Sequence, residues 1–139
     1  MNAIPSSVVL FLDDEKSYVE LMSQLLGDNL SCPVIGYTRP QDALADLPRR
    51  EVAVIVTDYS MPGMNGIDFL HRAHALRPQV AALMITGHQI ELAGTDFSTV
   101  PGLRETLFKP VTWRMLAERI IKYWPNGDPP MLKEDMGAL

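Results

Sequence analysis

Cysteine, long apolar runs and clusters of basic residues are scarce or missing in this chain. The single cysteine, Cys32, cannot form an internal disulfide, and its apolar surroundings indicate a small buried side chain rather than a nucleophile or metal ligand. No run reaches the roughly eighteen apolar residues of a membrane-spanning helix. The N-terminus lacks the basic and then apolar pattern of a secretion signal. The sequence therefore predicts a cytoplasmic protein that does not bind a membrane.

Positive charge is also in short supply. The chain carries 17 acidic and 12 basic residues, a net charge of -5, and its lysines and arginines form no cluster. Nucleic-acid binding depends on neutralising phosphates, so direct binding to DNA or RNA is not expected. A length of 139 residues with 47% hydrophobic and 21% charged residues is typical of one globular domain.

Short apolar runs alternate with helical patterns along the chain. Five runs have the branched or aromatic composition of strands: residues 8–12, 33–37, 52–56, 80–85 and 106–108. Helical spacing covers residues 18–26 closed by Gly27, 40–47 opened by Thr38, 66–76 opened by Asn65, and 113–124 capped by Thr112. The interval 88–101 has only a thin apolar stripe. This alternation predicts an α/β fold with a parallel sheet covered on both faces.

Polar residues follow four of the five predicted strands, and they are Asp13, Asp14, Asp58, Thr86 and Lys109, with Gly87 directly after Thr86. In such sheets, ligands bind beyond the carboxyl ends of the strands. Taken singly, Asp14 or Thr86 could cap a helix and Asp58 could open a turn. Taken together they predict a site, because three neighbouring carboxylates repel one another unless a cation offsets them.

The chemistry of this cluster favours a hard divalent cation and phosphoryl transfer. Oxygen ligands without histidine or cysteine favour Mg²⁺, with Mn²⁺ as a substitute, and disfavour zinc. A carboxylate beside Mg²⁺, a lysine and a hydroxyl suits phosphoryl transfer. Asp58 stands alone after the central strand and is the candidate nucleophile, whereas Asp13 and Asp14 form a pair suited to the metal. Glycines in the following loop let main-chain groups near Ser60 face the site.

Four motifs in order make the chain resemble a response-regulator receiver domain of two-component signal transduction, over about residues 7–124. They are Leu12-Asp13-Asp14-Glu15, the stretch from Asp58 to Gly66, Ile85-Thr86-Gly87 and Lys109-Pro110. The resemblance implies a flavodoxin-like doubly wound sheet of five parallel strands, in the order 2-1-3-4-5, with about five helices. It also implies a phosphoacceptor in a phosphorelay rather than a dedicated enzyme.

The resemblance further implies a role for each residue. Asp58 would accept a phosphoryl group from a histidine kinase or a histidine phosphotransfer protein. Asp13, Asp14, Asp58 and the carbonyl of Ser60 would surround Mg²⁺. Lys109, after a cis peptide bond to Pro110, would contact a phosphoryl oxygen, and Thr86 with Gly87 would form the phosphate-contacting switch.

One position departs from the family pattern. Receivers usually carry an aromatic residue three positions before the lysine, and here that position is Thr106. We expect output to run instead through the site loops or the last helix. Phe108 lies on the same strand face by the period of two; it either compensates for the missing aromatic residue or, as we predict, is a buried core residue. His88, two residues past Thr86, either hangs over the site or is an exposed loop residue.

The sequence divides into a receiver domain at residues 1–124 and a tail or linker at 125–139, which is rich in proline and glycine. The tail is too short for an effector domain, so the partner is either a separate downstream protein or a domain of a longer chain. One alternative function is a pseudo-receiver, an interaction module that needs no phosphorylation. Another is a phosphohydrolase of the haloacid-dehalogenase type, which would need an acid where Ser60 stands.

Overall fold

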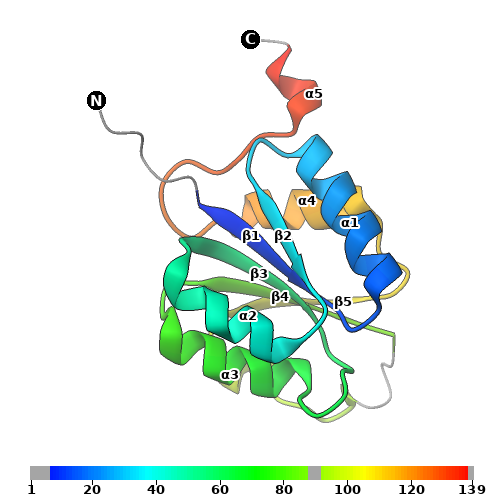
Figure 1. Ribbon diagram of the computed structural model, residues 1–139, viewed down its shortest axis with the longest axis vertical. Helices are drawn as coiled ribbons and strands as arrows, with labels where there is room; N and C mark the ends of the chain where they lie inside the picture. The colour runs from blue at the N-terminus through cyan, green and yellow to red at the C-terminus, as the bar shows by residue number, and fades with distance from the viewer. Residues whose placement is uncertain (1–6, 88–91, 138–139) are drawn as a thin grey trace.

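The computed structural model describes residues 7–87 and 92–137, so His88 lies outside the described residues. Its centre is a sheet of five parallel strands in the order β2-β1-β3-β4-β5 (Figure 1). The strands are β1 (Val8–Leu12), β2 (Val34–Tyr37), β3 (Val52–Asp58), β4 (Ala81–Thr86) and β5 (Leu103–Phe108). Every residue of β1, β3 and β4 is buried, as expected for a parallel sheet covered on both faces. The predicted fold class and strand order are confirmed.

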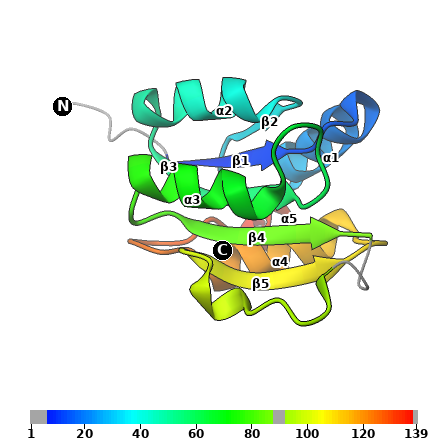
Figure 2. The ribbon, with the colours of Figure 1, turned by 90° about the horizontal axis from the view of Figure 1, so that it is seen from below.

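Helices cover both faces of the sheet. Helices α1 (Lys16–Asn29) and α4 (Trp113–Lys122) lie on one face, and α2 (Pro40–Asp46) and α3 (Gly66–Leu76) lie on the other (Figures 1 and 2). Each face has its own core, because neighbouring residues of a strand point to opposite sides. Phe11 packs under α1 and α4, whereas Leu10 and Leu12 pack under α2 and α3.

The helix signals read from the sequence had mixed success. Asn65 caps α3 by accepting a hydrogen bond from the backbone N–H of Asp68 at 2.9 Å, and Thr112 caps α4 in the same way through Met115 at 3.1 Å. Gly27 does not close α1, which continues to Asn29. Thr38 does not open α2 either, because the residue before its first turn is Arg39.

The connection between β4 and β5 contains little regular structure in its described part. The described residues 92–101 include the short 3₁₀ turn η3 (Phe97–Thr99) and no α-helix. A second short 3₁₀ turn, η1 (Leu47–Arg49), follows α2. The described residues hold five α-helices, and the fifth is α5 (Lys133–Met136) in the tail. The two edge strands, β2 and β5, are more exposed than the three inner strands.

The described tail, residues 125–137, packs back on the domain at the edge where the strands begin (Figure 1). Ser31 donates its backbone N–H to the carbonyl of Met131 at 2.9 Å, and Leu30 forms an antiparallel bridge with Leu132. Glu134 accepts from both terminal nitrogens of Arg114 on α4, at 2.7 and 3.3 Å. The tail is thus tied to the end of α1 and to α4.

Candidate functional site

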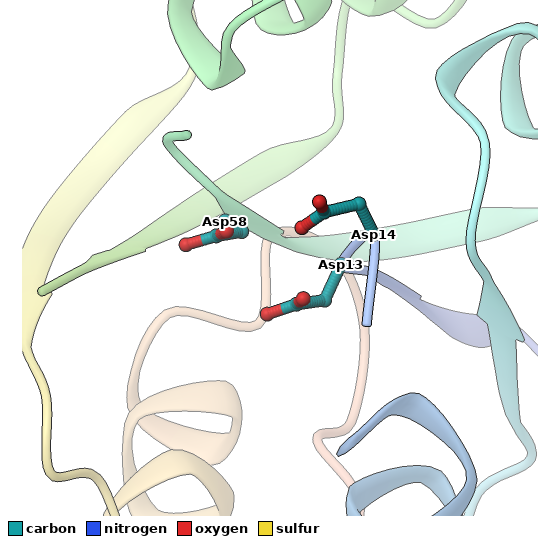
Figure 3. Close-up of side chains that lie close together, drawn as sticks. All are labelled: Asp13, Asp14 and Asp58. Atoms are coloured by element: carbon teal, nitrogen blue, oxygen red, sulfur yellow. The ribbon is translucent and has the colours of Figure 1, made fainter. Parts of the chain in front are cut away.

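The acidic residues predicted from the sequence meet at one edge of the sheet. Asp13 and Asp14 follow β1, and Asp58 is the last residue of β3. Their side chains gather beyond the ends of these two strands (Figure 3), and one carboxylate oxygen from each lies within 4.8 Å of the others. Among the described residues this is the one group of three or more acids, histidines or cysteines with metal-ligand spacing.

The three acids differ in exposure. Asp13 is 3% exposed and accepts a hydrogen bond from the backbone N–H of Glu15 at 2.9 Å. Asp58 is 6% exposed, while Asp14 is open to solvent. Two acids are therefore held in place by the fold, and the third forms the solvent side of the cluster.

Lys109 supplies the positive charge of the site. It follows β5, and its backbone N–H donates to the carbonyl of Thr86 at 2.8 Å. Its ammonium nitrogen lies 3.5 Å from Oδ2 of Asp13 and 3.6 Å from Oδ1 of Asp58. The Lys109–Pro110 peptide bond is cis, as the resemblance implied.

One lysine does not compensate the buried acids. Burial raises the pKa of Asp58 to about 6, and repulsion from Asp13 adds to this against the attraction of Lys109. Burial also raises the pKa of Asp13, although its hydrogen bond from Glu15 and the nearby Lys109 oppose the rise. Burial lowers the pKa of Lys109, but the attraction of Asp13 and Asp58 outweighs it, so the pKa of Lys109 is raised. Lys109 therefore neutralises the acids only in part, and a further positive charge nearby would favour their ionised forms.

The loop after Asp58 is shaped by two glycines. Gly63 has a φ of 79°, a left-handed conformation that disfavours a side chain. Gly66 donates its N–H to the carbonyl of Tyr59 at 2.7 Å, and a Cβ there would lie 2.5 Å from the carbonyl oxygen of Asp58. Ser60, three residues before Gly63, is exposed. A compact backbone turn thus folds directly against the end of β3.

The last part of the predicted site lies on β4 and β5. Thr86 is fully buried, and Gly87 lies against the lysine side chain, since a Cβ there would meet Cδ of Lys109 at 3.9 Å. Thr106 is half-buried, and its hydroxyl has no hydrogen-bond partner within the described structure. A shallow hollow beside Thr106 is bordered by Phe108 and by Phe97 of the η3 turn.

The prediction that Phe108 is a buried core residue is wrong. Its side chain is 40% exposed. It is the last residue of the edge strand β5.

One residue next to the site was not predicted to belong to it. Tyr18, assigned from the sequence only to the apolar stripe of the first helix, places its ring centroid 5.0 Å from Nζ of Lys109. It lies on the first turn of α1, four residues after Asp14 in the chain. That position just past a strand end is the signal that could have identified it.

The chain belongs to the response regulator receiver domain family, whose sequence pattern matches residues 9–121. It is therefore a receiver domain of the kind used in two-component systems. No helix in the described parts of the chain has the length and apolar character needed to cross a membrane.

Curated relatives of this chain are longer proteins with further activities. Protein-glutamate methylesterase/protein-glutamine glutaminase 1 of Cupriavidus metallidurans is 36% identical over 112 residues, which are 71% of this chain and 31% of that protein. The C4-dicarboxylate transport transcriptional regulatory protein DctD of Rhizobium meliloti is 31% identical over 88 residues, 63% of this chain and 18% of that protein. This chain thus spans a third or less of either relative.

A solved structure supports the same assignment. The response regulator receiver domain protein (CheY-like) from Methanospirillum hungatei superposes with a TM-score of 0.74 at 27% identity. The match covers 84% of this chain and 92% of that one.

Proposed function

We propose that this receiver domain accepts a phosphoryl group on Asp58 from a phosphohistidine of a histidine kinase or a histidine phosphotransfer protein. The observation that carries the proposal is the convergence of Asp13, Asp14 and Asp58 within 4.8 Å, with Lys109 3.6 Å from Asp58. Asp58 ends the central strand and is the acid that both Lys109 and Asp13 face.

The transfer exchanges one bond to phosphorus for another. An oxygen of the Asp58 carboxylate forms a bond to phosphorus as the bond from phosphorus to the histidine nitrogen breaks. The imidazole keeps the electron pair of that bond. It leaves as neutral imidazole if its other nitrogen already carries a proton, and otherwise it takes a proton from solvent. Lys109 contacts a phosphoryl oxygen during this exchange, and Thr86 with Gly87 forms the neighbouring wall that responds to the added group. In this role the domain takes part in its own modification and is not a dedicated enzyme.

The donor set suits Mg²⁺, with Mn²⁺ as a substitute. Asp13, Asp14, Asp58 and the carbonyl of Ser60 are the proposed ligands, and all of them offer oxygen. The raised pKa of Asp58, about 6, reflects carboxylates that one lysine does not neutralise. A bound divalent cation would supply positive charge at that point and so favour the ionised carboxylates.

The output is proposed to act on a protein partner. The lengths of the methylesterase and of DctD leave room in those proteins for domains beyond the part that this chain matches. The same receiver can act on such a domain within a longer chain or on a separate protein. A hollow lies beside Thr106, at the position where receivers usually carry an aromatic residue. The response to phosphorylation would therefore use the site loops or α4.

The proposal is tested by phosphorylation with acetyl phosphate and Mg²⁺, followed by intact-protein mass spectrometry. Wild-type protein should gain one phosphoryl group and Asp58→Asn none. Asp28→Asn is the matched control, because it makes the same change of charge at an exposed position near the end of α1. Equal behaviour of wild type and Asp58→Asn would reject the phosphoacceptor role and favour the pseudo-receiver.

The metal assignment has its own test. Removing even an outer partner of a metal site costs about 10- to 100-fold in affinity, so Asp13→Asn should weaken Mg²⁺ binding by about tenfold or more. Calorimetric titration measures this change. An unaltered affinity would contradict the role of Asp13 as a ligand, whatever the outcome of the phosphorylation test.

A further inference from the structure

Tyr18 connects α1 to the lysine of the site. Its ring centroid lies 5.0 Å from Nζ of Lys109, within the distance at which a cation is attracted to an aromatic face. The other two cation–π pairs of the described structure, Arg114 with Trp113 and Lys122 with Tyr123, join neighbours in sequence. The pair of Tyr18 and Lys109 instead joins the first helix to the end of the last strand.

The Tyr18 ring is itself held in place. Its centroid lies 5.8 Å from that of Phe11 on β1, with the two planes inclined at 45°. Phe11 is 1% exposed and belongs to the core between the sheet and α1. Tyr18 is half-buried against the same core, so its ring is a fixed surface rather than a freely moving side chain.

Lys109 needs such a surface because its own contacts leave it free to move. Its side chain is 35% exposed, and lysine carries its charge on a flexible stem of four carbons. Its two carboxylate contacts, at 3.5 and 3.6 Å, are longer than the usual charge-assisted hydrogen bond of about 2.7 to 2.9 Å. These contacts attract the ammonium without fixing it at one point.

We propose that Tyr18 is a positioning residue of the phosphoacceptor site, whose ring face holds the Lys109 ammonium between Asp13 and Asp58. This inference rests on the proposed function. The ring of Tyr18 supplies a third contact to the ammonium, from α1. Tyr18 itself touches neither the phosphoryl group nor the metal ligands in this role. It acts only through Lys109.

The ring face, and not the hydroxyl, carries the effect. Tyr18→Phe keeps the aromatic face and should behave as wild type, whereas Tyr18→Leu keeps apolar contact with Phe11 but removes the face. A cation–π contact of this kind corresponds to about a two- to fivefold effect on a rate or equilibrium. Phosphorylation of Tyr18→Leu by acetyl phosphate should therefore be about two- to fivefold slower, with Mg²⁺ affinity unchanged.

A direct measurement of the contact separates positioning from a general effect on folding. In unphosphorylated protein with isotope-labelled lysine, the protons on the ε-carbon of Lys109 should be shifted upfield by the ring current of Tyr18. The shift should persist in Tyr18→Phe and vanish in Tyr18→Leu. Lys16 and Lys133 serve as internal references. Tyr18→Met is the second variant if Tyr18→Leu does not fold, since methionine fills irregular apolar space well.

The outcomes distinguish this inference from the function on which it rests. Lys109 resonances that do not respond to Tyr18→Leu, or a Tyr18→Phe variant as slow as Tyr18→Leu, would overturn the positioning role. Wild-type protein that accepts no phosphate would overturn the proposed function, while the ring-current measurement would still report the contact. A slow Tyr18→Leu variant with a normal Tyr18→Phe variant and a lost ring-current shift supports the proposal.

Discussion

Replacing Asp58 by asparagine should stabilise the metal-free protein. The Asp58 side chain is 8% exposed, and burial, with repulsion from Asp13, raises the pKa of its carboxyl from 3.8 to about 6. Because the folded-state pKa lies above that of the unfolded chain, the unfolded chain loses this proton at a lower pH. The associated stability is complete below about pH 3.8 and is lost as the pH rises through about 6. At neutral pH the ionised carboxylate of Asp58 therefore lowers the free energy of unfolding.

The size of this cost follows from the pKa. A rise from 3.8 to about 6 corresponds to about 3 kcal/mol at neutral pH. The substitution also removes the contact of Asp58 with Lys109 at 3.6 Å, which offsets part of the gain. We expect Asp58→Asn to raise the free energy of unfolding at pH 7 by about 1 to 3 kcal/mol.

Urea denaturation in the presence of EDTA measures this difference. The gain should be present at pH 7 and should shrink toward pH 4, where the wild-type carboxyl is protonated in the folded state. Asp28→Asn, with the same change of charge at an exposed position, should stay within about 0.5 kcal/mol of wild type. A variant that is less stable than wild type at pH 7, or equally stabilised at both pH values, would refute the reasoning.

Three further changes test the surroundings of the site. Lys109→Ala should bind Mg²⁺ at least as tightly as wild type, because it leaves the acids without their own cation. The variant should nevertheless lose the response to beryllofluoride. Weaker Mg²⁺ binding by calorimetry would contradict this. Gly66→Ala should lower the free energy of unfolding by about 1 to 3 kcal/mol, since its Cβ would meet the backbone oxygen of Asp58 at 2.5 Å; an unchanged urea midpoint would show that the loop relaxes freely. Thr112→Ala should cost about 1 kcal/mol by removing the cap of α4, with Thr95→Ala as a control outside any helix.

The positions of the strands, and the edge of the sheet that carries the site, could be predicted from the sequence for the same physical reason. A parallel sheet covered on both faces needs continuous apolar strands, and each such run then ends on the polar residues that face the ligand. Val52 to Val56 followed by Asp58 is the clearest case, and the structure buries all of it. The acids could be grouped without coordinates because parallel strands end at the same edge.

The edge strand β5 was predicted too short because two charged residues, Arg104 and Glu105, interrupt the apolar pattern in its first half. The sequence indicated only residues 106–108, whereas the strand begins at Leu103 and includes Arg104 and Glu105. Glu105 is tolerated on the inner face because Arg119 and Tyr123 of the α4 region bind it, at 3.1 and 2.8 Å. Such compensation depends on residues more than ten positions away, and no local pattern reports it.

Tyr18 and the docked tail were missed for the same kind of reason. Helical spacing assigns Tyr18 to an apolar stripe but does not say that Lys109, from the opposite end of the chain, will lie over its ring. The tail reads as a linker because of its prolines and glycine, and its attachment depends on the bridge between Leu30 and Leu132. Both contacts exist only once the fold brings distant segments together.

The attachment of the tail gives α1 a contact at each of its ends. Its first turn carries Tyr18 beside Lys109, and its last residue precedes Leu30, where the tail is attached. A helix of 14 residues is about 21 Å long and is stiff on that scale. A tilt of its first turn would therefore either move the tail or be absorbed at the contact of Leu30 with Leu132. A spectroscopic probe on the tail would distinguish these two outcomes, because it would respond to a change around Lys109 only if the tilt reaches the tail.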